Sequence, residues 1–330
     1  MTTDVNGAPG GQPPTSRNPS SPYCQRGTGG RHSWRHVSEG GFDATLFDVR
    51  PIPEALARSI VASHHYAGTL PATRLSWGLL TRDDRLIDDS TPLSGGLGLV
   101  GVACLSVPMT ASVLTNVFPQ LEPFTESLEL GRLVLTDPVP ANAESWFLAR
   151  VWRQAAAVGL RGIVSFADPL PRQRTTTRTL PDGTAAEVVE TISPGHVGAC
   201  YQGAGAIACG RSTARTLIYL PRHGTVLSER TLSKIRLQES GSAAAERHLV
   251  ALGAAPRPIS QDPRAWLRSA LDDVGAVRLR HPGNFRYAWP IGTRRQRRGF
   301  TIAVPSTRNP KADTHRLPAP IVAPSRSADS

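Results

Sequence analysis

The stretch LELGRLVLTDPVPANAESWFLARVWRQAAAVGLRGIVSFADP, residues 128–169, decides the fold. Residues 128–135 are mostly apolar and predict a buried strand. Residues 141–159 repeat apolar side chains at helical spacing, and Asn142 is a candidate capping residue for that amphipathic helix. Residues 162–169 then predict a second buried strand. A strand, a helix and a strand in this order indicate an α/β unit in which the helix packs on the sheet.

The second of these strands ends in polar residues. Ser165 and Asp168 interrupt the apolar sequence GIVSFADP at residues 162–169. Open α/β sheets bind their ligands at the carboxyl ends of strands. The end of this strand is therefore a candidate site.

Apolar patterns continue on both sides of this unit. Further strands are predicted at 75–80, 97–108, 215–221 and 284–292, a hairpin at 174–192, and helices at 51–67, 228–237, 242–253 and 263–275. Because strands and helices alternate, the predicted fold class is α/β (α+β), with a mixed β-sheet flanked by helices.

The two ends of the chain differ in composition from its middle. Residues 1–40 are rich in Gly, Pro, Ser and Asn and predict a disordered leader, and residues 304–330 contain five prolines and predict a disordered tail. We therefore expect one folded catalytic body over residues 41–303, with a hairpin insertion at about 172–193.

The chain is strongly basic. Its 330 residues carry a formal charge of +11, and residues 291–330 contain eight Lys or Arg and two Asp, a local charge of +6. A basic segment of this kind is typical of nucleic-acid contact, although a solvated tail in an arginine-rich protein explains it equally well. No apolar run is long enough to cross a bilayer and no secretory signal is present, so a cytoplasmic location without a membrane partner is expected.

Several familiar motifs do not apply. Gly96, Gly98 and Gly101 match G-x-G-x-x-G, but a polar loop precedes them and a strand follows, which favours a glycine-rich turn over a dinucleotide site. No phosphate-binding P-loop sequence is present, and no G-x-S-x-G elbow surrounds Ser165. The four cysteines fit neither a disulfide framework nor a zinc site.

The strand–helix–strand unit is similar to that of acyl-CoA-dependent N-acyltransferases. In those enzymes a glycine-rich loop between strand and helix holds a pyrophosphate at the helix N-terminus. This chain has TDPVPANAES at 136–145 instead, and Pro138 and Pro140 each remove a backbone donor. The usual acyl-CoA contact is therefore weakened, although the helix N-terminus remains available to an anion.

A set of short motifs in one order is more specific. SHHYAG at 63–68, ELGRLV at 129–134, NAESWFL at 142–148, SFADP at 165–169 and GHVGACYQGAG at 195–205 follow one another along the chain. This set resembles the Mom family of phage DNA-modification proteins over about residues 50–220, and NFRYAWP at 284–290 is a further match. The resemblance implies an N-acetyltransferase-like fold. It also implies conversion of adenine in DNA to N6-carbamoylmethyladenine, which protects phage DNA from host restriction in the host cell cytoplasm.

The resemblance also implies site residues. Carried over one by one, they are the catalytic His65, Ser165, Asp168 and Tyr201 and the substrate-binding Tyr66, Arg132 and His196. The N6 amine is a poor nucleophile, so a base, here Asp168 or His65, would take its proton. Tyr201 would protonate a leaving group, Arg132 would bind the anionic part of a donor, and Ser165 would hydrogen-bond the adenine or the transferred amide. Each residue also has a structural alternative, such as an ion pair between Arg132 and the neighbouring Glu129.

Double-stranded DNA and a small-molecule donor are the expected partners. Candidate DNA-binding residues are Arg172 and Arg174 in the hairpin and Arg294, Arg295, Arg297 and Arg298 near the C-terminus. A surface insertion without function is the slightly favoured alternative for the hairpin. An N6 amine inside a duplex is reached only when the base leaves the stack.

The donor is left open by the sequence. An acetyl-CoA-like or a glycine-derived compound would fit the transferred group, and iron is a minority alternative through His64, His65 and Asp168. The sequence contains no metal-ligand spacing, so no metal site is assigned. Two other functions compete: a generic N-acyltransferase acting on a small amine or protein, and a non-catalytic DNA-binding protein. The sequence does not predict the DNA target context or the oligomeric state.

Overall fold

The computed structural model describes residues 42–65, 67–140, 142–179, 181 and 183–311. It also places two N-terminal strands, β1 (Tyr23–Thr28) and β2 (Arg31–His36), which pair antiparallel. Of the predicted leader the structure describes only these two strands, and most of the predicted tail lies outside the described residues.

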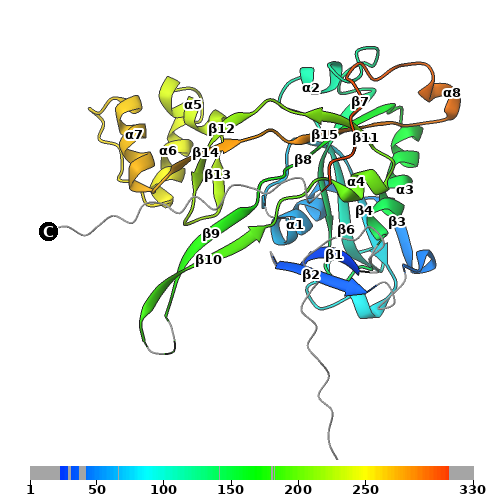
Figure 1. Ribbon diagram of the computed structural model, residues 1–330, viewed down its shortest axis with the longest axis horizontal. Helices are drawn as coiled ribbons and strands as arrows, with labels where there is room; N and C mark the ends of the chain where they lie inside the picture. Colours follow the sequence, from blue (N-terminus) through cyan, green and yellow to red (C-terminus); the bar gives the residue numbers. More distant parts are fainter. Residues whose placement is uncertain are drawn as a thin grey trace, which may run out of the picture.

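An eight-stranded sheet forms the centre of the molecule. Its strands are β3 (Phe47–Pro51), β4 (Thr73–Thr81), β5 (Leu93–Ser94), β6 (Leu97–Ser106), β7 (Ser127–Leu135), β8 (Gly162–Ala167), β11 (Ile207–Arg211) and β15 (Phe285–Pro290). The strand order is β11-β15-β8-β7-β6-β4-β3, with β5 paired to β6 (Figure 1). Only β7 and β8 run parallel, and all other neighbours are antiparallel. The predicted mixed sheet flanked by helices is confirmed.

Helices cover both faces of this sheet. The long helix α3 (Ala143–Ala157) buries Phe147, Leu148 and Val151 in a cluster with Ala103 and Leu105 of β6. Helix α1 (Glu54–His64) packs instead against the alternate β6 residues Val102 and Cys104. Because successive strand residues point to opposite faces, α1 and α3 lie on opposite sides of the sheet. Burying each large apolar side chain of α3 contributes about 2 kcal/mol, which fixes the helix on the sheet.

The second face carries a further cluster. It includes α2 (Ser112–Thr115) with Leu114, Val164 of β8 and Ala288 of β15. A short helix, α4 (Ala199–Gly203), follows the long connection after β8 and packs beside α3. A last short helix, α8 (Arg294–Arg297), follows β15.

Strands β7 and β8 diverge soon after they begin. Their parallel pairing covers only Ser127–Glu129 with Gly162–Val164. Beyond that point β7 has a register irregularity against β6, between the partners of Cys104 and Leu105. The two strands therefore open into a V toward their carboxyl ends, the edge at which the sequence places Ser165 and Asp168.

A hairpin arm, residues 172–193, projects from the end of β8. It consists of β9 (Arg172–Thr179) and β10 (Ala185–Ser193), which pair antiparallel, so the predicted hairpin is confirmed. Leu180 and Asp182 of its turn lie outside the described residues. The phenol of Tyr219 accepts a hydrogen bond from the Gln173 amide at 2.9 Å, and the Thr175 amide donates to Pro221 O at 2.9 Å.

An insertion lobe, residues 212–282, lies between the sheet neighbours β11 and β15 (Figure 1, yellow and orange). Its strands β12 (Arg215–Leu220), β13 (Thr225–Leu227) and β14 (Val277–His281) form a separate antiparallel sheet. Its helices are α5 (Glu229–Leu237), α6 (Ser242–Ala251) and α7 (Pro263–Asp273). The lobe has its own core around Leu220, Ile235 and Trp266. The lobe therefore folds around a group of apolar residues separate from the clusters of the central sheet.

The expectation for Asn142 is wrong. This residue has a φ of 71°, its side chain makes no capping hydrogen bond, and α3 begins at Ala143. Asn tolerates the left-handed region better than most residues, which explains why it occupies this turn. Of the three motif glycines, only Gly96 lies in a turn, with a φ of 77° between β5 and β6, whereas Gly98 and Gly101 lie in β6. Of the described helices, none has the length and apolar character of a membrane span.

Candidate functional site

The candidate site lies where β7 and β8 diverge. Arg132 comes from β7, Asp168 follows β8, His65 is the first residue after α1, and His196 precedes α4. These segments are far apart in the sequence. The charges on Arg132, His196 and Arg172 all lower the pKa of His65, so the four side chains are close enough to interact electrostatically.

Asp168 is held on three sides. Its Oδ1 accepts hydrogen bonds from the Leu170 amide at 3.0 Å and from His281 Nε2 at 3.0 Å, and its Oδ2 accepts one from Arg172 at 2.7 Å. Burial raises the pKa of Asp168, but the hydrogen bond from His281 and the charge of Arg172 outweigh burial and hold the pKa well below its usual range. A carboxylate bound in this way stays ionised and is a poor proton acceptor.

His281 connects the insertion lobe to the site. It is fully buried at the end of β14, and its Nδ1 accepts a hydrogen bond from the Gly283 amide at 2.9 Å. Because Nδ1 accepts, the ring hydrogen lies on Nε2 and is donated to Asp168. No sequence pattern indicated this contact, because the two residues are 113 positions apart.

His65 is a neutral imidazole. Its Nδ1 accepts a hydrogen bond from the Ala67 amide at 3.0 Å, which places the ring hydrogen on Nε2. Burial, followed by the charges of Arg132, His196 and Arg172, lowers its pKa to about 3. Near neutral pH the ring is therefore a hydrogen-bond donor at Nε2, and it is a weaker base than an ordinary histidine.

Arg132 is oriented by the backbone around it. Its Nε donates to Thr69 O at 2.9 Å and its Nη1 to Gly131 O at 2.6 Å. Three residues earlier on β7, Glu129 is half-buried, and none of the hydrogen bonds among the described residues engages its carboxylate. Burial raises the pKa of Glu129, and the charge of Arg132 opposes that rise only in part. The sequence analysis considered Glu129 only as an ion-pair partner of Arg132. Its position as a carboxylate within an apolar strand could have marked it as a site residue.

Ser165 and Tyr201 are buried beside this cluster. The Ser165 hydroxyl has no exposed surface and donates to Leu130 O at 3.0 Å, across the opening between β8 and β7. Tyr201 is 6 % exposed, and its ring meets those of Tyr287 at 5.6 Å and His196 at 6.0 Å, measured between ring centroids. Both residues therefore belong to a buried layer behind the cluster, which we call the wall.

Tyr287 also belongs to this wall, although the sequence did not single it out. Its hydroxyl donates to Val197 O and accepts a hydrogen bond from the Gln202 amide nitrogen at 2.9 Å. These hydrogen bonds fix the loop that carries His196. The His196 side chain is exposed, although other parts of the protein lie close around it. Desolvation by the surrounding protein lowers the pKa of His196, and the charge of Asp168 opposes that change.

The predicted DNA-binding arginines divide into three groups. Arg172 belongs to the site, through its ion pair with Asp168. Arg174 forms an ion pair with Glu190 across the hairpin arm at 2.7 Å. Arg294, Arg295, Arg297 and Arg298 lie in or directly after α8, beyond the carboxyl end of β15. The antiparallel register places Phe285 against Ala167 and Pro290 against Gly162, so α8 is at the opposite edge of the sheet from Asp168. Tyr66 lies outside the described residues.

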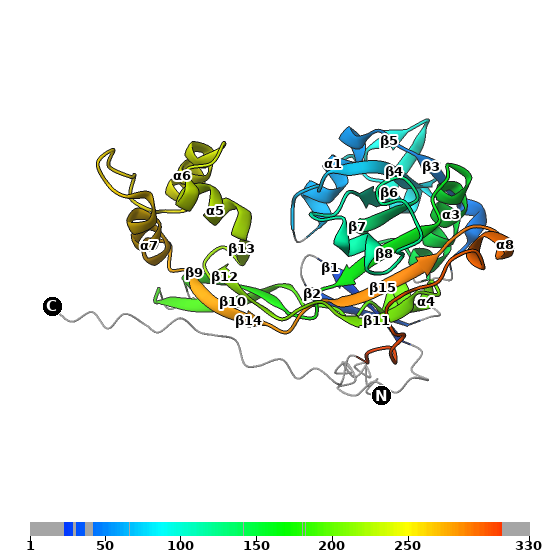
Figure 2. The same cartoon turned by 90° about the horizontal axis from the view of Figure 1, so that it is seen from above.

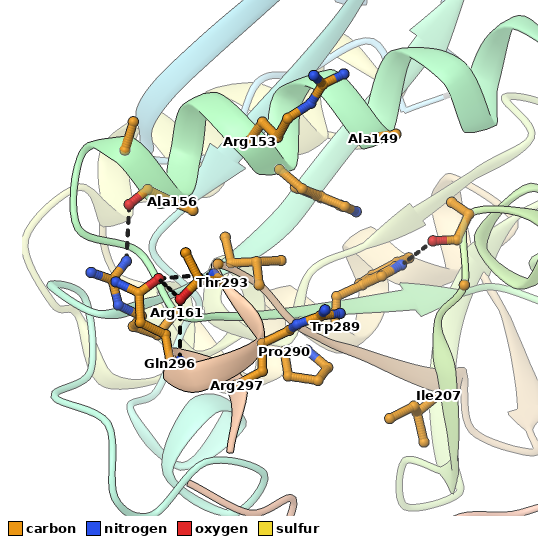
Figure 3. Close-up of a pocket in the computed structure, with 16 residues that line it drawn as sticks. Ala149, Arg153, Ala156, Arg161, Ile207, Trp289, Pro290, Thr293, Gln296 and Arg297 are labelled. Atoms are coloured by element: carbon orange, nitrogen blue, oxygen red, sulfur yellow. Dashed lines mark hydrogen bonds between the residues drawn. The ribbon is translucent and has the colours of Figure 1, made fainter. Parts of the chain in front are cut away.

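A pocket of about 900 Å³ lies at that opposite edge, between α3, the end of β15 and α8 (Figure 3). Trp152 and Trp289 meet in it with ring centroids 5.2 Å apart, and Arg153, Arg161 and Arg297 line its walls. Arg161 donates to the carbonyl oxygens of Ala156 and Leu160 and so completes the C-terminal end of α3. The pocket contains none of the predicted catalytic residues.

The expectation of iron has no support. Among the described residues no group of three or more His, Cys, Asp or Glu side chains is arranged to hold a metal ion. Of the imagined ligands, His65 uses Nδ1 for the Ala67 amide, and Asp168 is occupied by Arg172 and His281. These residues do not fit a metal centre, and no step of the chemistry below uses one.

The mixed sheet, the helix that links its one parallel pair and the V between those strands are the arrangement expected of an N-acetyltransferase-like fold. Residues 46–174 match the model of the Mom protein family. The resemblance inferred from the sequence is therefore confirmed over these residues, which include His65, Arg132 and Asp168 but not His196 or Tyr201. No curated protein matches the chain.

Three solved structures show a distant likeness. A GNAT family N-acetyltransferase, YhbS from Escherichia coli in complex with CoA, has 11% identity and a TM-score of 0.27, covering 47% of this chain and 86% of that one. A tandem GNAT protein from the clavulanic acid biosynthesis pathway has 13% identity, a TM-score of 0.28 and 75% coverage of both chains. A CoA-dependent acyl-homoserine lactone synthase, MesI, has 15% identity and a TM-score of 0.19, covering 39% of this chain and 69% of that one. These scores are too low to carry an argument, and the fold assignment stands on the strand order.

Proposed function

We propose that this protein transfers a carbamoylmethyl group to the exocyclic N6 of adenine in DNA and so protects phage DNA from host restriction. The observation that carries the proposal is the cluster of Arg132, His65, Arg172 and His196 at the V between β7 and β8, inside or next to the segment that matches the Mom family. Among the described residues no carboxylate is hydrogen-bonded to Arg132, whose guanidinium donates to two backbone carbonyls, so this charge suits an anionic donor or a DNA phosphate.

The N6 lone pair is delocalised into the purine ring, so transfer requires removal of a proton and a fixed electrophile. Glu129 is the residue we assign as base, because its pKa is raised and its carboxylate has no hydrogen-bond partner among the described residues. Asp168 is assigned to positioning, because its carboxylate already binds Arg172 and His281. The bond formed joins N6 to the methylene carbon of the donor, whose bond to its leaving group breaks while Glu129 takes the N6 proton.

The other side chains have supporting roles in this proposal. Arg132 binds the anionic part of a glycine-derived donor whose methylene carbon carries the leaving group, and His65 donates from Nε2 to an oxygen of donor or substrate. Tyr201 protonates the leaving group once substrate has opened the wall formed with Tyr287. Ser165 fixes the separation of β7 and β8 at the V through its hydrogen bond to Leu130 O. The adenine enters this site after leaving the base stack.

Restriction digests test the function directly. DNA from bacteria that express the full chain should resist endonucleases whose recognition sites contain adenine, because a group on N6 blocks major-groove contacts to that base. The same DNA should be cut normally by endonucleases whose sites contain only guanine and cytosine. Complete cutting by both sets of enzymes, with the protein present and folded, would refute adenine modification and favour the N-acyltransferase or DNA-binding alternatives.

A further inference from the structure

The insertion lobe has an excess of positive charge that its own acidic residues do not neutralise. Residues 212–282 contain eleven Lys or Arg and six Asp or Glu. Glu229 forms an ion pair with Arg236 and Glu246 one with Arg257, while Asp262 caps α7. Six exposed arginines have no side-chain hydrogen bond or ion pair among the described residues: Arg215, Arg222, Arg247, Arg268, Arg278 and Arg280.

Two of these arginines lie on the strand that leads to the candidate site. Strand β14 starts at Val277 in the lobe and ends at His281, which donates to Asp168. Because side chains alternate along a strand, Arg278 and Arg280 point to the face opposite that of His281. Consecutive Cα atoms are about 3.8 Å apart, so Arg280 lies directly beside the residue that binds Asp168.

That face of β14 is the one on which the lobe helices pack. Arg278 is paired across the sheet with Ile218, whose side chain lies against the core formed by α5, α6 and α7. Arg280 is paired with Thr216, nearer the central sheet, and both arginines are exposed. Figure 2 shows the lobe helices and the body that contains α1 and β7 on the same side of β14. Arg278 and Arg280 thus lie on the exposed face of β14, between the lobe helices and the candidate site.

The opposite face of this small sheet is already occupied. Tyr219 of β12 points there and binds Gln173 of the hairpin arm, and His281 points there toward Asp168. Gly224, in the turn after β12, has a φ of 65°, and a Cβ at this position would collide with Ile192 of β10. The arm thus packs closely under the lobe, which leaves Arg278 and Arg280 on the accessible side.

We propose that the exposed face of β14 binds the phosphate backbone of duplex DNA, with Arg278 and Arg280 contacting phosphates beside the adenine that enters the site. This inference rests on the proposed function for the identity of the duplex as substrate. Unpaired guanidinium groups are good phosphate ligands, because they offer several donors in a fixed plane. Phosphate contacts set the position of the protein on the duplex and carry no sequence preference of their own.

The test is equilibrium binding of a fluorescent adenine-containing duplex to the full chain, without donor, over a range of salt concentrations. The double variant Arg278→Gln/Arg280→Gln should bind about tenfold more weakly, and the slope of log K against log salt should fall in magnitude by about two, one for each lost phosphate contact. The matched control is Arg82→Gln/Arg153→Gln, which also removes two exposed arginines, both outside the insertion lobe and the candidate site. This control should keep the wild-type affinity and slope.

Equal affinities and slopes for the wild type and the β14 variant, or equal losses in the β14 variant and the control, would overturn the proposal. Circular dichroism melts of both variants show whether the fold is retained. The outcomes separate the two proposals, because binding is measured without donor. If the β14 variant loses binding but the wild-type protein never modifies DNA, the proposed function is refuted and the proposed DNA-binding surface stands. Unchanged binding in a protein that does modify DNA would refute this surface alone.

Discussion

Asp168→Asn should destabilise the protein by about 3 kcal/mol and abolish DNA modification. The substitution keeps the size of the side chain but leaves Arg172 and His281 without their shared negative partner. Removing one member of a buried ion pair costs roughly 3–5 kcal/mol, and Arg172, with 21% of its side chain exposed, places the loss at the lower end. Urea denaturation followed by tryptophan fluorescence measures the change in the free energy of unfolding.

The matched control is Asp48→Asn, which breaks an ion pair with Arg50 on the surface. Both partners there are well exposed, at 50% and 38%, so the loss should stay below about 1 kcal/mol. The pH dependence follows from the lowered pKa of Asp168. Its stabilising contribution is fully present above the ordinary Asp pKa of 3.8 and is lost as the pH falls toward the lower pKa of the folded protein. Asp168→Asn with wild-type stability from pH 7 down to this range would contradict the assignment.

Glu129→Gln should lower the rate of DNA modification by at least about 100-fold while leaving the fold intact. Glutamine has nearly the same shape but does not accept the N6 proton, and a positioned base contributes about 10²- to 10⁴-fold. The carboxylate makes no hydrogen bond to the described residues, so its loss should change the free energy of unfolding little. The fraction of DNA protected from restriction, followed over time after induction, gives the relative rate.

Two comparisons make this second prediction specific. Glu122→Gln removes an exposed carboxylate that precedes β7, and this variant should modify DNA at the wild-type rate. Because burial raises the pKa of Glu129 above that of an ordinary Glu, the wild-type rate in a purified reaction should decline on acidification at a higher pH than 4.5. Equal rates for Glu129→Gln and the wild type would move the role of base to another residue.

The local patterns in the sequence predicted most of the central sheet. The strand–helix–strand unit at 128–169, the hairpin and the lobe helices depend on apolar periodicity within short windows, and all are present in the structure. The separate core of the insertion lobe was not foreseen, because Leu220 and Trp266 pack together across more than 40 intervening residues. A local sequence pattern does not indicate packing between residues so far apart in the chain.

The site was predicted in part for the same reason. The end of the strand at 162–169 identified Asp168 as a site residue, and the resemblance to the Mom family added Arg132. The partners that determine the role of Asp168 come from elsewhere: His281 lies in the lobe and Arg172 in the arm. Because of these contacts we propose a positioning role for Asp168, which the sequence analysis considered as a base, and we propose Glu129 as the base instead. Asn142 shows that even a local signal has more than one meaning, because Asn suits both a helix N-cap and a left-handed turn.

Mass spectrometry of nucleosides tests the central claim most directly, namely that the site between β7 and β8 modifies adenine. DNA from cells that express the full chain is digested to nucleosides and compared with DNA from cells that express Glu129→Gln. We predict a deoxyadenosine heavier by one carbamoylmethyl group, with the added mass on the base, in the wild-type sample and only a trace in the variant. Deoxyadenosine of ordinary mass in the wild-type sample, or equal amounts of the modified nucleoside in both samples, would contradict this account.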